Sequence, residues 1–135
     1  MCPVCREPMV AFELNGVEID RCLSCGGTWL DAGELELLTQ LAGAGGASDR
    51  LAHELARTPA GPRTTRRCPR CPRRLRSLEV GTPGRVVLDR CPRGHGLWFD
   101  RGEMEQVIRW YAGGTVARFF ADLYQGEQGS AQGGK

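Results

Sequence analysis

The chain has 135 residues, of which 41% are hydrophobic and 25% charged, with a net charge of +2. This composition excludes fibrous and intrinsically disordered proteins. The sequence shows no apolar run long enough to span a bilayer and no hydrophobic leader after Met1, so we expect a cytoplasmic protein without membrane contact. Residues 1–47 carry two arginines and seven acidic residues, whereas residues 48–135 carry 16 basic and nine acidic residues. The basic character therefore lies in the second half.

The chain opens on a Cys-Pro-x-Cys motif formed by Cys2 and Cys5. The proline presets the φ angle of a turn and so helps to aim two thiolates at one point, as a zinc knuckle requires. The apolar alternation that follows predicts strands over 10–14 and 17–20. Residues 15–16 are Asn-Gly, the strongest short-range signal for a β-hairpin.

A second cysteine pair, Cys22 and Cys25, follows this hairpin. Because the hairpin folds the chain back, the second pair approaches Cys2 and Cys5, with a spacing close to that of structural zinc sites. The seven cysteines of the chain could also form disulfides in a secreted protein. Without a secretory leader, metal ligation is the better interpretation.

A helix is expected next, because Asp31 and Glu34 stand three residues apart before an apolar run. This spacing is typical of a capping box, with Asp31 as the N-cap. We favour capping over acid–base chemistry, since no histidine or nucleophile accompanies the two carboxylates. Gly43 predicts the end of the helix. Residues 43–67 are interpreted as a Gly/Pro/Arg-rich linker with a short helix over 48–57.

The first unit is repeated 69 positions later, and such repeats guide the fold prediction. Cys68 and Cys71 form the second Cys-Pro-x-Cys motif, and Cys91 repeats Cys22. Gly94 replaces the fourth cysteine and His95 follows it. Because an imidazole reaches farther than a thiol, we expect a second site of three cysteines and His95. The other histidine, His53, lies far from any ligand pair and is interpreted as a solvated residue.

Further elements repeat as well. Apolar alternation predicts a second hairpin over 78–88, with its turn at 81–84. Asp100 and Glu103 repeat the capping pair before an amphipathic helix. A last amphipathic helix is expected over 113–125.

The expected fold is a small metal-stabilised α+β protein. It consists of two tandem zinc ribbons, each a β-hairpin with a short capped helix, and an additional C-terminal helix. Units of this size rarely fold on a hydrophobic core alone, so each is expected to hold one structural zinc ion. The predicted segments are 1–42 (first ribbon), 43–67 (linker), 68–112 (second ribbon), 113–125 (C-terminal helix) and 126–135 (disordered tail).

The repeated pattern resembles the bacterial zinc-ribbon family named for transcription factor IIB. The resemblance lies in Cys-Pro-x-Cys, Asp-Arg-Cys-x-x-Cys-Gly-Gly and Trp-Leu-Asp-x-Gly-Glu-Leu. Residues 2–38 match closely, and 68–107 match as a degenerate second copy. The resemblance implies zinc binding and a link to transcription or nucleic acid, although a fold does not fix a function.

Arginines gather around the second cysteine pair, and they favour a non-enzymatic module that contacts the phosphates of DNA or RNA. No aromatic residue interleaves with them, so base stacking is not indicated. The competing interpretation, a solvated linker in an arginine-biased chain, is weighed equally. The cluster consists of Arg63, Arg66, Arg67, Arg70, Arg73, Arg74 and Arg76.

Two alternatives stay open. One is a protein-interaction scaffold in which Trp29, Trp98 and the C-terminal helix offer apolar surface to a partner, although the tryptophans are better interpreted as filling the gap between hairpin and helix. The other is a thiol redox sensor, which is disfavoured because redox proteins usually need a single cysteine pair. Nothing indicates a catalytic role or a small-molecule substrate.

Overall fold

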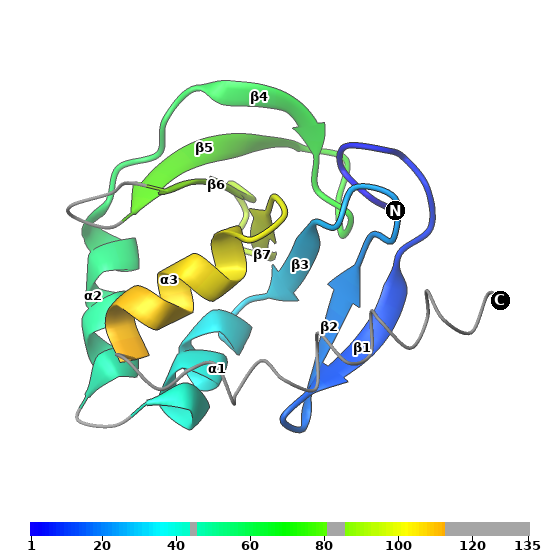
Figure 1. Cartoon of the computed structure of the whole chain (residues 1–135). Helices are drawn as coiled ribbons and strands as arrows, with labels where there is room; N and C mark the ends of the chain where they lie inside the picture. The colour runs from blue at the N-terminus through cyan, green and yellow to red at the C-terminus, as the bar shows by residue number, and fades with distance from the viewer. Residues whose placement is uncertain (44–45, 81–85, 113–135) are drawn as a thin grey trace, which may run out of the picture.

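The computed structural model describes residues 1–43, 46–80 and 86–112, which form one sheet and three helices (Figure 1). The helices are α1 (Glu34–Ala42), α2 (Ala47–Arg57) and α3 (Glu103–Ala112). The strands are β1 (Val10–Leu14), β2 (Val17–Arg21), β3 (Thr28–Asp31), β4 (Arg63–Arg67), β5 (Arg74–Val80), β6 (Val86–Arg90) and β7 (Gly96–Phe99). None of the helices in these ranges is long and apolar enough to cross a membrane.

Both predicted hairpins are present. β1 pairs antiparallel with β2, and β5 pairs antiparallel with β6. In the first hairpin, Asn15 and Gly16 both have positive φ, at 51° and 86°, as the Asn-Gly prediction requires. The predicted turn at 81–84 lies outside the described residues, as do the predicted C-terminal helix 113–125 and tail 126–135.

The two units join through β3 and β7 into one sheet with the order β1-β2-β3-β7-β6-β5-β4. These two strands pair antiparallel, with Trp29 opposite Trp98. Because Trp98 is the repeat of Trp29, an approximate twofold axis passes between the two indoles. The units are therefore halves of one structure, an arrangement that the prediction of two tandem zinc ribbons does not specify.

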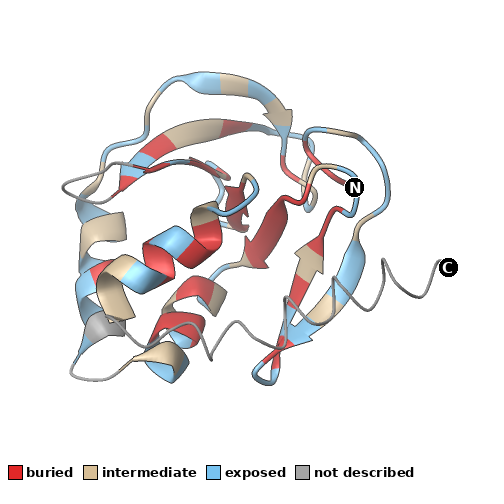
Figure 2. Ribbon diagram, viewed as in Figure 1, coloured by how far each residue is buried: buried red, intermediate tan, exposed pale blue. Residues whose placement is uncertain are grey.

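Neither β3 nor β7 shows an alternating pattern of apolar and polar residues, because both faces of each strand are covered. β7 is buried at all four positions and β3 at three of four, as the red ribbons of Figure 2 show. A short run that is buried on both faces has no period-2 signal. This is why the sequence predicted strands only in the hairpins.

The sheet separates two hydrophobic clusters. The three helices lie together on one side (Figure 1), where their apolar residues pack with Leu30 and Phe99. Trp29 and Trp98 belong instead to the second cluster, which contains the cysteines of both repeats. The predicted position of the tryptophans between hairpin and helix is therefore wrong: they pack beside the cysteines.

The segment predicted as a linker with a short helix, 43–67, contains that helix as α2, and in addition it contains β4. α2 has Gly46 as its N-cap, with φ 79°. β4 is an edge strand whose five residues are exposed or half-buried, so it needs no apolar alternation. Its Thr64 hydroxyl donates to the Leu75 carbonyl at 2.8 Å and helps to tie the edge to β5.

Half of the predicted capping box is present in the first unit. α1 begins at Glu34 after Gly33, which has φ 88° and makes no side-chain cap, so the prediction of Asp31 as N-cap is wrong. The Glu34 carboxylate does reach back, accepting a hydrogen bond from the Asp31 backbone N–H at 2.7 Å. Glu103 accepts from the Asp100 N–H in the same way, at 2.8 Å.

Candidate metal centres

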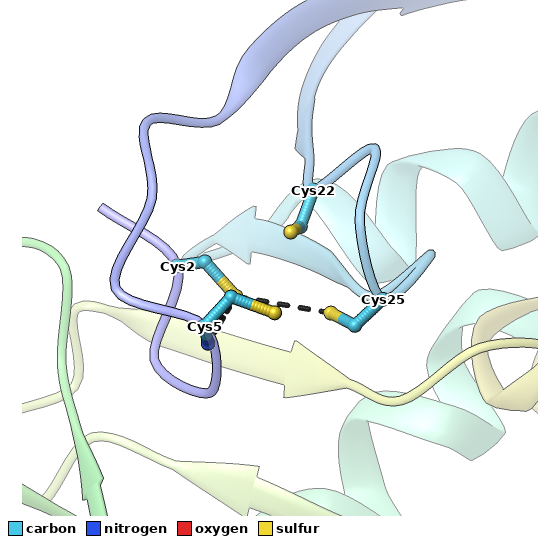
Figure 3. A group of neighbouring side chains, drawn as sticks. All are labelled: Cys2, Cys5, Cys22 and Cys25. Atoms are coloured by element: carbon cyan, nitrogen blue, oxygen red, sulfur yellow. Dashed lines mark hydrogen bonds between the residues drawn. The ribbon is translucent and has the colours of Figure 1, made fainter.

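The first candidate site lies where the loop before β1 meets the turn after β2. Cys2 and Cys5 come from the loop, Cys22 and Cys25 come from the turn, and their thiols point toward one another (Figure 3). The four sulfur atoms lie within 4.8 Å of one another, and the sulfurs of Cys2 and Cys25 are 3.8 Å apart. Four thiolates at a Zn–S distance of ~2.3 Å form a tetrahedron with edges of about 3.8 Å. The donor set and its spacing therefore fit zinc.

The second candidate site brings together Cys68, Cys71, Cys91 and His95. The sulfurs of Cys71 and Cys91 are 3.7 Å apart. Nδ1 of His95 lies 3.4 Å from the Cys91 sulfur and 4.0 Å from the Cys68 sulfur. These separations are also near the tetrahedral edges that zinc requires, with Nδ1 as the fourth ligand atom.

The two turns have the same length, each closed by a cysteine N–H that donates to a glycine carbonyl five residues on, from Cys22 to Gly27 and from Cys91 to Gly96, but they differ in their inner hydrogen bond. In the first unit the Gly26 N–H donates to the Cys22 carbonyl at 2.8 Å, four residues back. In the second unit the Gly94 N–H donates to the Cys91 carbonyl at 2.9 Å, three residues back. Gly26 and Gly94 provide the positive φ of each turn, at 76° and 79°. The tighter inner hydrogen bond of the second turn places its positive-φ glycine one position earlier, and the next residue, His95, reaches the thiols with its ring.

Backbone N–H groups donate to the sulfur atoms. The N–H groups of Val4 and Cys5 each lie 3.3 Å from the Cys2 sulfur. The Arg70 N–H lies 3.3 Å from the Cys68 sulfur, a contact equivalent to that of Val4. Such bonds favour the thiolate form, which is the form that binds a metal.

The thiols of each site differ in acidity. Burial raises the pKa of Cys22, but backbone N–H groups, mainly that of Cys25, outweigh it and bring the pKa to about 7. The pKa of Cys91 is lowered to about 7 by the same balance. Burial and the neighbouring thiols raise the pKa of Cys5 to about 12, and the pKa of Cys68 is also raised to about 12. Each site therefore needs a cation before all of its thiols can ionise.

The two sites are coupled through the tryptophan pair. A Cβ added to Gly27 would lie 2.2 Å from the Trp98 ring, and one added to Gly96 would lie 2.7 Å from the Trp29 ring. Gly96 is the repeat of Gly27, so each metal turn packs closely on the indole of the other unit. The turn after Cys25 thus needs Gly26 for its φ angle and Gly27 for the space that Trp98 occupies.

Two of the seven clustered arginines are bound to aspartates. An Arg66 Nη donates to Asp89 at 2.7 Å and to Asp100 at 3.0 Å. Arg70 reaches across to the first unit, where it donates to Asp20 at 2.7 Å and to Asp31 at 2.9 Å. Arg66 and Arg70 therefore stabilise two equivalent aspartate pairs.

These contacts were missed by the sequence analysis, although a signal exists. Asp20 and Asp31 recur as Asp89 and Asp100 in the second copy. Asp31 and Asp100 each also accept a hydrogen bond from a tryptophan Nε1. The distance is 2.8 Å from Trp29 to Asp31 and 3.2 Å from Trp98 to Asp100. The Arg70 hydrogen bond is the main reason that the pKa of Asp31 lies below its usual value.

The other five clustered arginines gather around one hollow. The hollow has a volume of about 320 Å³ and lies along β4 and β5 beside Pro92. Its arginines are Arg63, Arg67, Arg73, Arg74 and Arg76. His53 lies away from both metal centres, on α2, where its ring nitrogen is 3.4 Å from an Arg57 Nη.

A comparison with known protein families agrees with the geometry. The family model described as "Transcription factor zinc-finger", the TFIIB-type zinc ribbon, matches residues 1–40 and 67–109. No curated protein and no solved structure matches the chain. The matched segments cover more than half of the sequence and each contains one cysteine-rich centre that could bind zinc. The chain therefore belongs to the TFIIB-type transcription factor zinc-finger family, of which it carries two tandem copies.

Proposed function

We propose that this protein is a non-enzymatic, transcription-associated adaptor in which two structural zinc ions hold a scaffold that binds nucleic acid. The proposal rests on one observation: five arginines line a single hollow on only one half of a nearly symmetric fold. Clustered guanidinium groups release the counterions that condense on phosphates, which drives association with DNA or RNA.

The asymmetry argues against a general arginine bias of the chain. The first-unit counterparts of Arg73, Arg74 and Arg76 are Glu7, Pro8 and Val10. A general bias toward arginine would raise the arginine content of both units, yet residues 1–47 contain two arginines and residues 48–135 contain 15. The restriction of the clustered arginines to the second unit is what a binding surface requires.

The metal centres support a structural role for zinc. Each centre offers four protein ligands, three or four of which are thiols. Catalytic zinc sites usually have three protein ligands and keep one position open for water or substrate. A closed site stabilises a small fold and leaves the binding chemistry to the arginines.

The test is a fluorescence titration with mixed-sequence DNA and RNA at several salt concentrations. We expect Arg67→Gln/Arg73→Gln/Arg74→Gln to weaken binding and flatten its salt dependence. Arg6→Gln/Arg57→Gln/Arg109→Gln is the matched control, because it removes the same charge from exposed positions outside the hollow. Zinc content should not change in either variant. Failure of the wild-type protein to bind at low salt would contradict the proposal.

A second candidate function, a protein-interaction scaffold, is favoured by apolar exposure on the first unit. Val4 is 43% exposed, Val10 41% and Leu23 56%, all beside the first cysteine cluster. Trp29 and Trp98 do not contribute to such a surface, because both are fully buried. A pull-down that survives high salt and is lost in Val10→Ser/Leu23→Ser would favour this candidate. The predicted contact through 113–125 stays a prediction.

A further inference from the structure

The arginines of the hollow are paired across two strands. In the β4–β5 register, Arg63 lies opposite Arg76 and Arg67 lies opposite Arg74. All four side chains line the same hollow. We call these four residues the arginine ladder. The two pairs are four residues apart on β4 but only two apart on β5, because the register shifts between Arg63 and Arg67.

Such an arrangement is unfavourable without an anion. Directly opposed residues of an antiparallel pair have Cβ atoms only ~4.5–5.5 Å apart, and like-charged side chains placed directly opposite each other destabilise the pair. In the described part of the chain, no acidic side chain pairs with any ladder arginine, and the nearby aspartates are bound to Arg66 and Arg70. A bound anion would supply the charge that neutralises the ladder.

Each pair combines one anchored and one unanchored guanidinium. An Nη of Arg67 donates to the Pro72 carbonyl at 2.8 Å, and Nε of Arg76 donates to the Gly61 carbonyl at 3.0 Å. Within the described ranges, the guanidinium groups of their partners Arg74 and Arg63 make no hydrogen bond or ion pair. Because a guanidinium has five N–H donors, the anchored member keeps donors for a ligand while its position is fixed. The other member is free to close on the same ligand.

We propose that each cross-strand arginine pair binds one phosphate, so that the ladder holds two consecutive phosphodiesters of one nucleic-acid strand. This inference rests on the proposed function and specifies its binding mode. Arginine forks suit phosphate oxygens. Two residues along β5 span about 6.8 Å, comparable with the separation of successive phosphates in a nucleic-acid backbone. That span is longer than the distance between two phosphorus atoms that share one bridging oxygen, so the ladder favours phosphodiesters over pyrophosphate.

The test compares variants that remove the same charge from different pairs. Arg63→Gln/Arg76→Gln removes one whole pair, whereas Arg63→Gln/Arg74→Gln removes one member of each pair. The slope of log affinity against log salt counts neutralised phosphates, at about 0.7 per phosphate for single strands and about 0.9 for duplexes. Loss of a whole pair should reduce the slope by about one such increment. The diagonal variant should weaken binding but keep the wild-type slope, because each phosphate retains one arginine.

Titrations use a mixed-sequence oligonucleotide in single-stranded and in duplex form, which distinguishes the two sources of the phosphodiesters. Arg67→Gln/Arg74→Gln is the second whole-pair variant and should behave like the first. Zinc content and near-UV circular dichroism confirm that each variant is folded. Equal slopes for whole-pair and diagonal variants would overturn the ladder and leave the proposed function as a diffuse basic patch. No binding by the wild-type protein would overturn both.

Discussion

The two halves of the molecule keep the same interior and differ at the surface. Both have a cysteine-rich centre, a buried tryptophan and a glutamate that reaches back before the helix. Around the first centre the exposed side chains include Val10 and Leu23, whereas the equivalent positions of the second half are Arg76 and Pro92. Metal ligation and the central strand pair therefore define the scaffold, while the exposed positions are free to acquire separate binding properties.

The halves also differ in the origin of the arginine that binds their aspartate pair. The aspartate pairs of both halves bind arginines from one short segment, Arg66 for the second half and Arg70 for the first. The first-unit counterpart of Arg70 is Val4, so the first half has no equivalent arginine of its own. The first half therefore depends on the second for this contact as well as for the pairing of β3.

The largest expected effect comes from removing zinc. Structural zinc contributes on the order of 10–16 kcal/mol of apparent binding free energy in small zinc-finger peptides. Because both centres belong to one buried cluster with Trp29 and Trp98, chelation should unfold the whole sheet in one cooperative transition. Circular dichroism and tryptophan fluorescence should report coincident transitions. Two separate transitions would show that the halves fold independently.

The number of bound zinc ions tests the fourth ligand of the second centre. His95→Ala should release one zinc ion per chain in native mass spectrometry, because His95 completes the second centre. His53→Ala is the matched control and should release none. Equal zinc content in the wild type and His95→Ala would reject this ligand.

The next largest effect on stability is expected at Gly27, which packs against the Trp98 indole. Gly27→Ala should cost about 3 kcal/mol of unfolding free energy, because its Cβ would overlap the Trp98 ring. A second change, Trp98→Phe, removes the overlapping ring atoms and should recover part of this loss, whereas Trp29→Phe should not. Chemical denaturation of the zinc-saturated proteins measures both. Equal recovery by the two phenylalanine variants would disprove packing across the halves.

A smaller effect on stability is expected from Arg66 and Arg70, the two arginines that pair with aspartates. The Asp89 side chain is only 8% exposed, so Arg66→Gln leaves a buried carboxylate without its cation and should cost about 2 kcal/mol. Asp20 and Asp31 are 23% and 44% exposed, so Arg70→Gln should cost at most about 1 kcal/mol. Urea midpoints, with Arg109→Gln as an exposed control, test this order. A larger loss in Arg70→Gln would reverse it.

The smallest expected effect depends on pH. Burial raises the pKa of Glu103 from 4.5 to about 7, so the folded protein holds this proton more tightly than the unfolded chain. The resulting stability is complete below pH 4.5 and is lost as the pH rises to about 7. As the pH rises through that window, the stability of Glu103→Gln should increase relative to that of the wild type. The increase should be at most about 1 kcal/mol, because the carboxyl group is half exposed.

The equivalent carboxyl group provides the control. Burial also raises the pKa of Glu34, and Glu34→Gln should show the same sign with a smaller amplitude. Denaturation midpoints of zinc-saturated protein at several pH values measure the difference. An equal or larger gain in Glu34→Gln would mean that the two halves do not differ at this position.

The sequence predicted the features whose signals are local. Cysteine spacing indicated which thiols gather in each cluster, and alternation with Asn15-Gly16 indicated the first hairpin. The β3–β7 pairing joins residues 69 positions apart at the tryptophans, and nothing near Trp29 specifies its partner. β4 lacks an apolar pattern because it is an exposed edge strand. The different contacts of Arg66 and Arg67 also required the structure, since adjacent arginines look alike in a sequence.

The β3–β7 pairing also has a consequence for synthesis. Translation reaches Asp31 about 65 residues before it reaches Gly96, which β3 needs as a partner. At ~5–20 residues per second, the β3 edge of a nascent chain stays uncovered for roughly 3 to 13 s. Zinc can close the first centre in that interval, but it leaves Trp29 and a nearly self-complementary strand edge open to neighbouring chains on the same messenger RNA. A neighbouring nascent chain at the same stage therefore offers β3 a matching edge for strand exchange between copies.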